Sequence, residues 1–342
     1  MTRHRSVRWS LGIALLAGCR TAPVATPWTD TSPHRVSMVT VAPGVRLEVL
    51  DWGGSGPPLV FLSGLQDVAH GFDDFAPRFT DHFHVLAITR RGYGASSQPP
   101  SGYDLATRVA DDKAVLDSLG LGSVALVGHS IAGDELTAFA GAYPERVSRL
   151  VYFDAAYDHS QAGQLGRYFP QQPMTAADSA SPAAVQAYTL RTFGMNIPEA
   201  QLRAIARYAP SGHILADVTP ASIDSQVLAG CGHPDYTKVR APALVIYNVV
   251  DSAPPFFPRW AGLDSAQRDS ARRFTAGLQA WAATERAGVR SGLRGAQVIE
   301  LHGSNHYVFY ANEPEVERAM REFLGGAGRP GPSPSRASSR AD

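Results

Sequence analysis

The sequence predicts an α/β fold, a mostly parallel sheet with helices on both faces and an inserted helical cap. Short apolar runs alternate with segments of helical periodicity, the pattern of βαβ units around a sheet buried on both faces. One such run, 124–127, leads without a linker into Gly128-His129-Ser130 and then into a helix. Between residues 159 and 236 the strand rhythm stops, and short helical segments punctuated by prolines replace it. That segment is predicted to cover the sheet.

The N-terminal region carries targeting signals. Three arginines within the first eight residues precede a short apolar run that ends in Leu16-Ala17-Gly18-Cys19, which predicts a signal peptide over residues 1–18. The four residues Leu16-Ala17-Gly18-Cys19 resemble the bacterial lipobox. This resemblance implies that Cys19 becomes a lipid anchor and that the protein is exported to the bacterial cell envelope, on the periplasmic or extracellular face. The alternative is an ordinary cleaved signal with an incidental cysteine. Residues 19–35 are rich in Thr, Pro and Ser and are predicted to form a flexible tether.

Composition excludes several classes of function. The 342 residues include 31 Lys+Arg and 31 Asp+Glu, so no strong basic field favours nucleic acid as a partner. The sequence contains no phosphate-binding G-x-x-x-x-G-K-[ST] motif. Two cysteines are too few for a disulfide framework, and Cys231 is predicted to be a free, buried or half-buried thiol. No cofactor is predicted.

The core strands and helices follow the apolar pattern in chain order. Strands are predicted at 36–42 and 45–51, which form an opening hairpin, and at 59–62, 85–88, 124–127, 149–153, 243–247 and 297–301. Helices are predicted at 105–119, 133–140, 183–193, 199–208, 265–287 and 313–324. The core therefore comprises residues 36–158 and 237–325, the cap 159–236, and a disordered tail 326–342.

Ser130 lies where the 124–127 strand turns sharply into a helix. Such a turn lifts a serine above the sheet and places the adjacent backbone N–H groups at a helix N-terminus, where they can stabilise an oxyanion. The flanking positions must be small. Gly128 meets this need, but Ala132 stands where a second glycine is usual, and Gly133 comes one residue late. A serine in an ordinary strand-to-helix turn is the alternative.

A nucleophilic serine needs a base, and the base needs an orienting acid. His306 follows the last predicted strand, on a loop from which an imidazole can reach Ser130. For the acid, Asp251 follows the 243–247 strand and Asp154 follows the 149–153 strand. Both lie at strand ends, and we favour Asp251 with Asp154 as the alternative.

Five groups of residues occur in a characteristic order along the chain: Ser63-Gly64, Arg91-Gly92-Tyr93-Gly94-Ala95-Ser96, Gly128-His129-Ser130, Asp251 and His306. With them, the sequence resembles the α/β-hydrolase superfamily, capped Ser-His-Asp type, over residues 34–324. The resemblance implies a catalytic triad of Ser130, Asp251 and His306. It also implies an oxyanion hole formed by the backbone N–H groups of Leu65 and Ile131. Epoxide hydrolases and haloalkane dehalogenases of this fold carry aspartate at the position of Ser130, in the turn between strand and helix. The serine therefore argues against both activities.

The expected activity is a carboxylesterase acting on small or medium-sized apolar esters, with no cofactor. The alternatives are a lactonase, an amidase, a cofactor-free haloperoxidase-like enzyme, or a binding lipoprotein without catalysis. Aromatic residues follow both Asp251 and His306 and either line an apolar pocket or pack the cap against the core. His302 and His306, like His82 and His84, have metal-like spacing but lack a third ligand, so no metal site is predicted.

Overall fold

The computed structural model describes residues 28–160, 169–170 and 173–325. The predicted signal peptide, the Cys19 anchor, most of the tether, two short stretches of the predicted cap and the predicted tail lie outside the described residues. Among the helices in the described ranges, none has both the length and the hydropathy that crossing a membrane requires.

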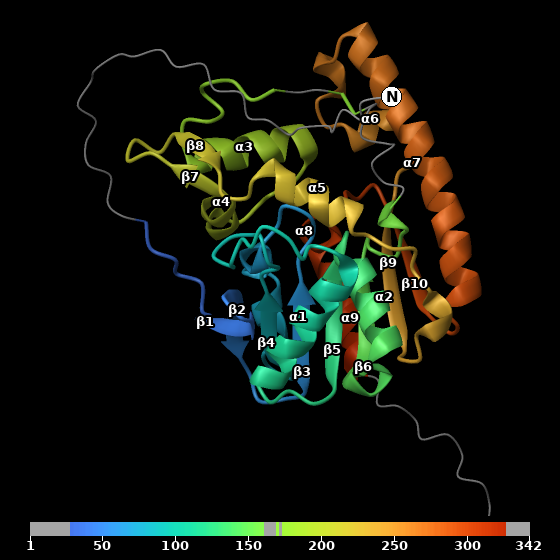
Figure 1. Ribbon diagram of the computed structural model, residues 1–342. Coiled ribbons are helices and arrows are strands. Elements are labelled where there is room, and N and C mark those ends of the chain that lie inside the picture. Colours follow the sequence, from blue (N-terminus) through green and yellow to red (C-terminus); the bar gives the residue numbers. More distant parts are fainter. Residues whose placement is uncertain (1–27, 161–168, 171–172, 326–342) are drawn as a thin grey trace, which may run out of the picture.

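One mixed sheet forms the centre of the molecule (Figure 1). Its strands are β1 (Arg35–Ala42), β2 (Val45–Gly53), β3 (Pro58–Leu62), β4 (His84–Ile88), β5 (Val124–His129), β6 (Val147–Phe153), β9 (Ala243–Val249) and β10 (Gln297–His302). They lie in the order β1-β2-β4-β3-β5-β6-β9-β10. The β1–β2 and β2–β4 pairs are antiparallel and all the others are parallel. The predicted fold class and the opening hairpin are confirmed.

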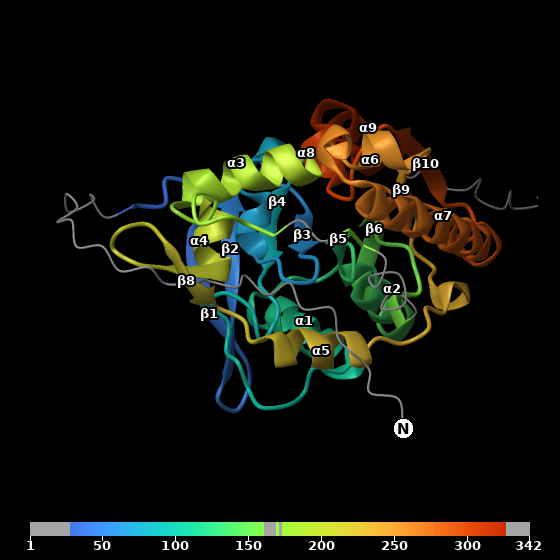
Figure 2. The ribbon, with the colours of Figure 1, turned by 90° about the horizontal axis from the view of Figure 1, so that it is seen from above.

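Helices cover both faces of the sheet, and Figure 2 shows α1 and α2 on one side of it with α8 and α9 on the other. The helices outside the cap are α1 (Leu105–Ser118), α2 (Ala132–Ala142), α6 (Ala253–Phe256), α7 (Ser265–Gly292), α8 (Val308–Ala311) and α9 (Glu313–Gly325). Leu136 and Phe139 of α2 and Val289 of α7 pack on one face. Val316 and Met320 of α9 pack on the other face. The parallel strands carry apolar side chains on both faces, and helices bury both of them.

The segment between β6 and β9 contains α3 (Pro182–Phe193), α4 (Glu199–Ile205), α5 (Ala221–Ala229) and a small antiparallel hairpin, β7 (Ala206–Tyr208) with β8 (Ile214–Asp217). In Figure 1 these elements lie together above the sheet. The prediction of a helix through residue 208 is wrong at its end. Pro210 cannot continue a helix, and Gly212 adopts a positive φ of +91° in the turn, so the chain reverses into a hairpin.

Candidate active site

Ser130 directly follows β5, and α2 begins two residues later. Its φ of +54° lies in the left-handed region, which is strained for any residue with a Cβ atom. The Ser130 N–H donates to the carbonyl oxygen of Phe153 at 3.1 Å, which ties the turn to the neighbouring strand β6. The chain therefore forms the sharp strand-to-helix turn that the sequence predicts.

Gly133 explains why the small residue of this turn comes one position late. A Cβ atom at Gly133 would lie 1.8 Å from the carbonyl oxygen of Ala155 and 3.1 Å from the Ala155 Cβ atom. Helix α2 thus approaches the backbone after β6 at position 133, and at position 132 a methyl group is tolerated in the core. The departure from the usual G-x-S-x-G spacing follows from this packing.

His306 is paired with Asp154. Its Nδ1–H donates to Asp154 Oδ2 at 2.7 Å. The Asp154 side chain is only 7% exposed, and its Oδ1 atom accepts from the Tyr157 hydroxyl at 2.6 Å and from the Asn248 N–H at 3.1 Å. Asp154 has a φ of +44°, a second strained residue at the same edge of the sheet. A carboxylate fixed by three donors holds the imidazole with Nε2 free to act as a base.

The structure does not bring Asp251, the acid that the sequence favours, to His306. Asp251 does not contact His306; both of its oxygens lie 2.8 and 3.0 Å from Nδ1 of His302. This pair is on the surface, with 56% and 59% of the two side chains exposed. Asp251 follows β9, which lies one strand farther from β5 than β6 does, so its loop points to a different part of the edge. Asp154, the alternative acid, lies next to His306 instead.

His129, the residue before Ser130, holds the loop of the base in place, a role that sequence reasoning missed. Its Nε2–H donates to the carbonyl oxygen of His306 at 3.1 Å, and the two rings lie 4.6 Å apart. Burial lowers the pKa of His129, which favours its neutral form. The side chains of Ser130 and His306 form no hydrogen bond with each other in the described structure. Such contacts often tighten only when substrate binds.

The two predicted oxyanion donors are backbone N–H groups without a hydrogen-bond acceptor in the described part of the chain. Neither the Leu65 N–H nor the Ile131 N–H forms a hydrogen bond within the described ranges. The loop that carries Leu65 lies against the turn at His129 and Ser130. A Cβ atom on Gly64 would be only 2.8 Å from His129 Nδ1. Two free backbone donors beside a nucleophile are what stabilisation of a tetrahedral intermediate needs.

The loop of residues 63–68 carries Leu65 and is called the oxyanion loop after its predicted role. A buried arginine joins it to helix α2, which follows Ser130. Arg90 donates to the carbonyl oxygens of Ser63 at 2.8 Å and Gly64 at 3.1 Å. The same guanidinium makes a bidentate pair with Glu135 of α2, at 2.7 Å to each oxygen. Arg108 adds a contact to Glu135 at 3.2 Å. Burial opposes the ionisation of Glu135, but Arg90 and Arg108 outweigh it and lower its pKa.

Cap residues bind the same loop from the other side. Gln201 of α4 donates to Asp67 Oδ1 at 2.8 Å and accepts from the Val68 N–H at 3.2 Å. Gln66 donates to Asp224 of α5 at 2.7 Å, and the second Asp224 oxygen accepts from the Tyr93 hydroxyl at 2.8 Å. The oxyanion loop is therefore fixed between the core and the cap.

Two of the aromatic residues that follow Asp251 and His306 pack the protein interior. Phe309 is 2% exposed and stacks on Phe153 with ring centroids 5.4 Å apart. Phe257 is 1% exposed and lies against Phe169 and Phe274. For Phe257 and Phe309, packing is the structural role, and they do not line an open pocket.

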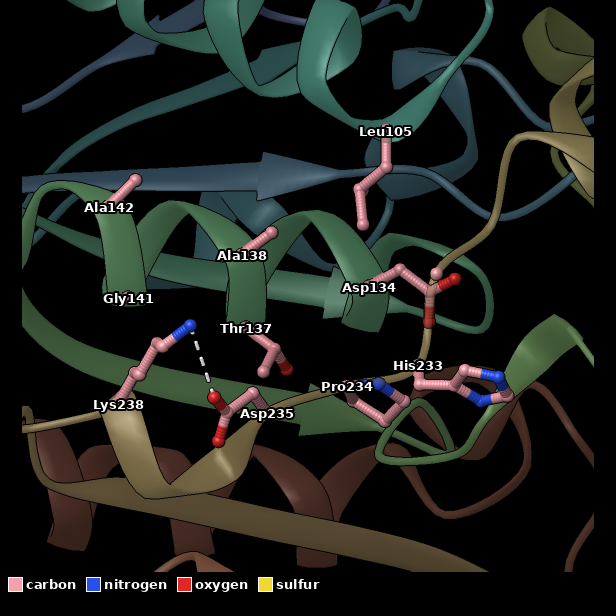
Figure 3. Close-up of a pocket in the computed structure, with 11 residues that line it drawn as sticks. Leu105, Asp134, Thr137, Ala138, Gly141, Ala142, His233, Pro234, Asp235 and Lys238 are labelled. Atoms are coloured by element: carbon pink, nitrogen blue, oxygen red, sulfur yellow. Dashed lines mark ion pairs between the residues drawn. The ribbon is translucent and has the colours of Figure 1, made fainter.

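A hollow of about 420 Å³ lies beside α2 (Figure 3). Its lining comes from α2, from the segment 232–238 and from Leu105 of α1. None of Ser130, Asp154 and His306 lines it. Lys238 and Asp235 form an ion pair at its rim, at 3.2 Å. Nearby, Cys231 is a free, half-buried thiol, as predicted, and burial raises its pKa to about 12.

Comparisons with known proteins agree with this architecture. Residues 57–187 match the family model described as alpha/beta hydrolase fold. The chain is 37% identical over 120 residues to a non-heme chloroperoxidase of Streptomyces lividans, covering 34% of this chain and 44% of that protein. It is 28% identical over 208 residues to the 2-(acetamidomethylene)succinate hydrolase of Mesorhizobium japonicum, covering 56% of this chain and 70% of the relative. The match thus spans less than half of the chloroperoxidase.

Solved structures extend the likeness to most of the chain. The crystal structure of E-2-(acetamidomethylene)succinate hydrolase superposes with a TM-score of 0.62 at 21% sequence identity, covering 86% of this chain and 100% of that one. The protein therefore has the α/β-hydrolase fold.

Proposed function

We propose that the protein is a serine hydrolase that cleaves carboxylic esters through an acyl-enzyme on Ser130. The observation that carries this proposal is the Asp154–His306 hydrogen bond of 2.7 Å, formed beside the strained serine at the same edge of the sheet. A base held by a buried acid, a serine on a sharp turn and two free backbone donors together match the requirements of acyl transfer.

In the proposed mechanism, His306 Nε2 accepts the Ser130 hydroxyl proton while Oγ attacks the ester carbonyl carbon. The N–H groups of Leu65 and Ile131 stabilise the resulting oxyanion. Asp154 orients the imidazole and stabilises its protonated form. The imidazolium then gives its proton to the departing alcohol, which leaves the acyl group on Ser130. A water molecule, deprotonated by His306, attacks the acyl carbon. The imidazolium returns that proton to Ser130 Oγ as the acyl–oxygen bond breaks, which releases the carboxylic acid and restores the free serine.

Labelling with a fluorophosphonate probe tests the activated serine. The purified native chain is expected to label, and Ser130→Ala and His306→Ala are expected to lose the label, because the first lacks the nucleophile and the second the base. Ser304→Ala is the matched control, a serine on the same loop as His306, and should label like the native chain. A folded native chain that does not label would support a binding protein that has kept the fold without the chemistry.

A second candidate is an activity on lactones or amides, or a cofactor-free haloperoxidase-like activity. The likeness to a chloroperoxidase and to a succinate-derivative hydrolase supports keeping it. A panel of esters, lactones and amides distinguishes these reactions once labelling is established, because all of them use the same serine.

We also propose that the chain is exported and anchored through a lipid on Cys19, on the basis of the Leu16-Ala17-Gly18-Cys19 motif. After expression in a bacterial host, the native chain is expected in the membrane fraction and Cys19→Ala in the soluble fraction. Cys231→Ala is the control and should stay with the membrane. Equal fractionation of the native chain and Cys19→Ala would contradict the anchor.

A further inference from the structure

Four side chains with metal-binding atoms meet at a place separate from Ser130 and His306. Asp30 and His34 lie in the segment that leads into β1, His70 lies in the short 3₁₀ helix η1 (Ala69–Phe72), and Asp73 follows directly. One nitrogen or oxygen atom from each of the four lies within 4.8 Å of all the others. The His34 and Asp73 side chains are 3% and 2% exposed, so water is largely excluded from them.

The four side chains already contact one another. Asp73 lies at the centre, with Oδ1 2.9 Å from His34 Nδ1 and Oδ2 2.9 Å from His70 Nδ1. The carboxylate of Asp30 lies 3.4 Å from His70 Nδ1 and 3.5 Å from His34 Nε2. Tetrahedral zinc with bonds of about 2.0 Å places its ligand atoms about 3.3 Å apart. These contacts use both oxygens of Asp73 and both ring nitrogens of His34. One ligand atom from each side chain lies within 4.8 Å of the others, so the side chains must turn and close in around the ion to form the site.

A further carboxylate lies near one of the histidines, beyond direct hydrogen-bond distance. Glu48 Oε1 lies 3.9 Å from His70 Nε2, on the side of the ring away from Asp73. Glu48 is buried and its other oxygen accepts from the Thr89 hydroxyl at 2.7 Å. Histidines that bind metals commonly direct the second ring N–H to a carboxylate, which fixes the tautomer and the ring orientation.

The charge of this cluster also favours a cation. Three carboxylates, from Asp30, Glu48 and Asp73, face two imidazoles, and no lysine or arginine of the described chain forms an ion pair with them. Carboxylates that are removed from water need a compensating charge. Two imidazole nitrogens with two carboxylate oxygens are a ligand set of zinc and related first-row ions, and magnesium and calcium prefer oxygen alone.

We propose that Asp30, His34, His70 and Asp73 form a structural site for a zinc-like divalent transition metal ion. Four protein ligands close the coordination sphere, so the ion would take no part in ester cleavage. It would fasten the segment before β1 to η1, which follows the oxyanion loop. The site is independent of the proposed serine chemistry.

Metal analysis of the full chain tests the proposal. The protein is dialysed against EDTA, exposed to zinc, freed of excess metal by gel filtration, and its zinc content measured. One zinc per chain is expected, together with an unfolding temperature that rises with zinc concentration. Cobalt in place of zinc is expected to give the visible absorption of a four-coordinate ion, a readout of the ligand geometry that does not depend on activity.

Three variants assign the site. Asp73→Asn is expected to lose the zinc, and Asp30→Asn, at the more exposed edge of the cluster and therefore less disturbing to folding, is expected to bind it at least about tenfold more weakly. His82→Gln is the control, because the His82 side chain is 72% exposed and outside the cluster. The proposal is overturned if the native chain retains no zinc, or if all three variants bind zinc as the native chain does. Fluorophosphonate labelling after EDTA treatment should be unchanged, which separates this outcome from that of the serine chemistry.

Discussion

The Asp154→Asn variant is expected to lower kcat/KM on an activated ester by about 10³- to 10⁴-fold, because an amide at this position no longer holds the His306 ring in the tautomer that accepts the serine proton. Asp251→Asn is expected to keep nearly native activity, since it removes only an exposed pair with His302, and such pairs contribute little. Initial rates of ester hydrolysis with the two purified variants, at equal concentration of labelled active sites, provide the measurement.

Thermal unfolding of both variants is the necessary control, because Asp154 also accepts hydrogen bonds from Tyr157 and Asn248. A loss of rate that accompanies a native-like unfolding temperature assigns the effect to the base. The opposite pattern, with Asp251→Asn inactive and Asp154→Asn active, would show that the loops rearrange in the working enzyme and would restore Asp251 as the acid.

The second large effect is expected from Glu135→Gln. Glu135 is buried and compensates the charges of Arg90 and Arg108, which are themselves almost fully buried. Removing one partner of such a cluster leaves charge without compensation and costs about 3–5 kcal/mol of the free energy of unfolding. Urea unfolding measures this loss. Turnover at a temperature where the variant stays folded is also expected to fall, because Arg90 holds the carbonyls of Ser63 and Gly64.

The matched control for this variant is Glu300→Gln. Glu300 pairs with Arg290 on the surface, where 61% of the arginine side chain is exposed, so the expected loss is about 1 kcal/mol or less. If Glu135→Gln were no more destabilising than Glu300→Gln, the buried arginines would not depend on Glu135 for their charge compensation.

The fold was predictable because its signals are local. Between residues 59 and 247, the continuous apolar runs predicted as strands form buried parallel strands, and the eight predicted strands all appear in the sheet. The strand, turn and helix around Ser130 are likewise adjacent in the sequence. The sequence showed only that the glycine of this turn stands one position late, at Gly133. The reason is the close approach of the Ala155 carbonyl, which belongs to the segment after the neighbouring strand β6.

The choice of acid depends on geometry that the sequence does not carry. Asp154 and Asp251 both follow a parallel strand at the same edge, and only the strand order and the backbone direction at Asp154 separate them. The Asp30, His34, His70 and Asp73 cluster was hidden for a similar reason. Asp30 and His34 lie in a segment that composition predicts to be a tether, and no spacing relates them to His70 and Asp73.

Gln201 donates a hydrogen bond to Asp67 and accepts one from the Val68 N–H, and these two bonds couple the position of α4 to that of the oxyanion loop. A movement that lifts α4 breaks both bonds, each worth about 0.5–1.5 kcal/mol, and frees the loop that carries the Leu65 donor. In the proposed mechanism, a displacement of α4 would therefore loosen the loop that supplies one of the two oxyanion donors.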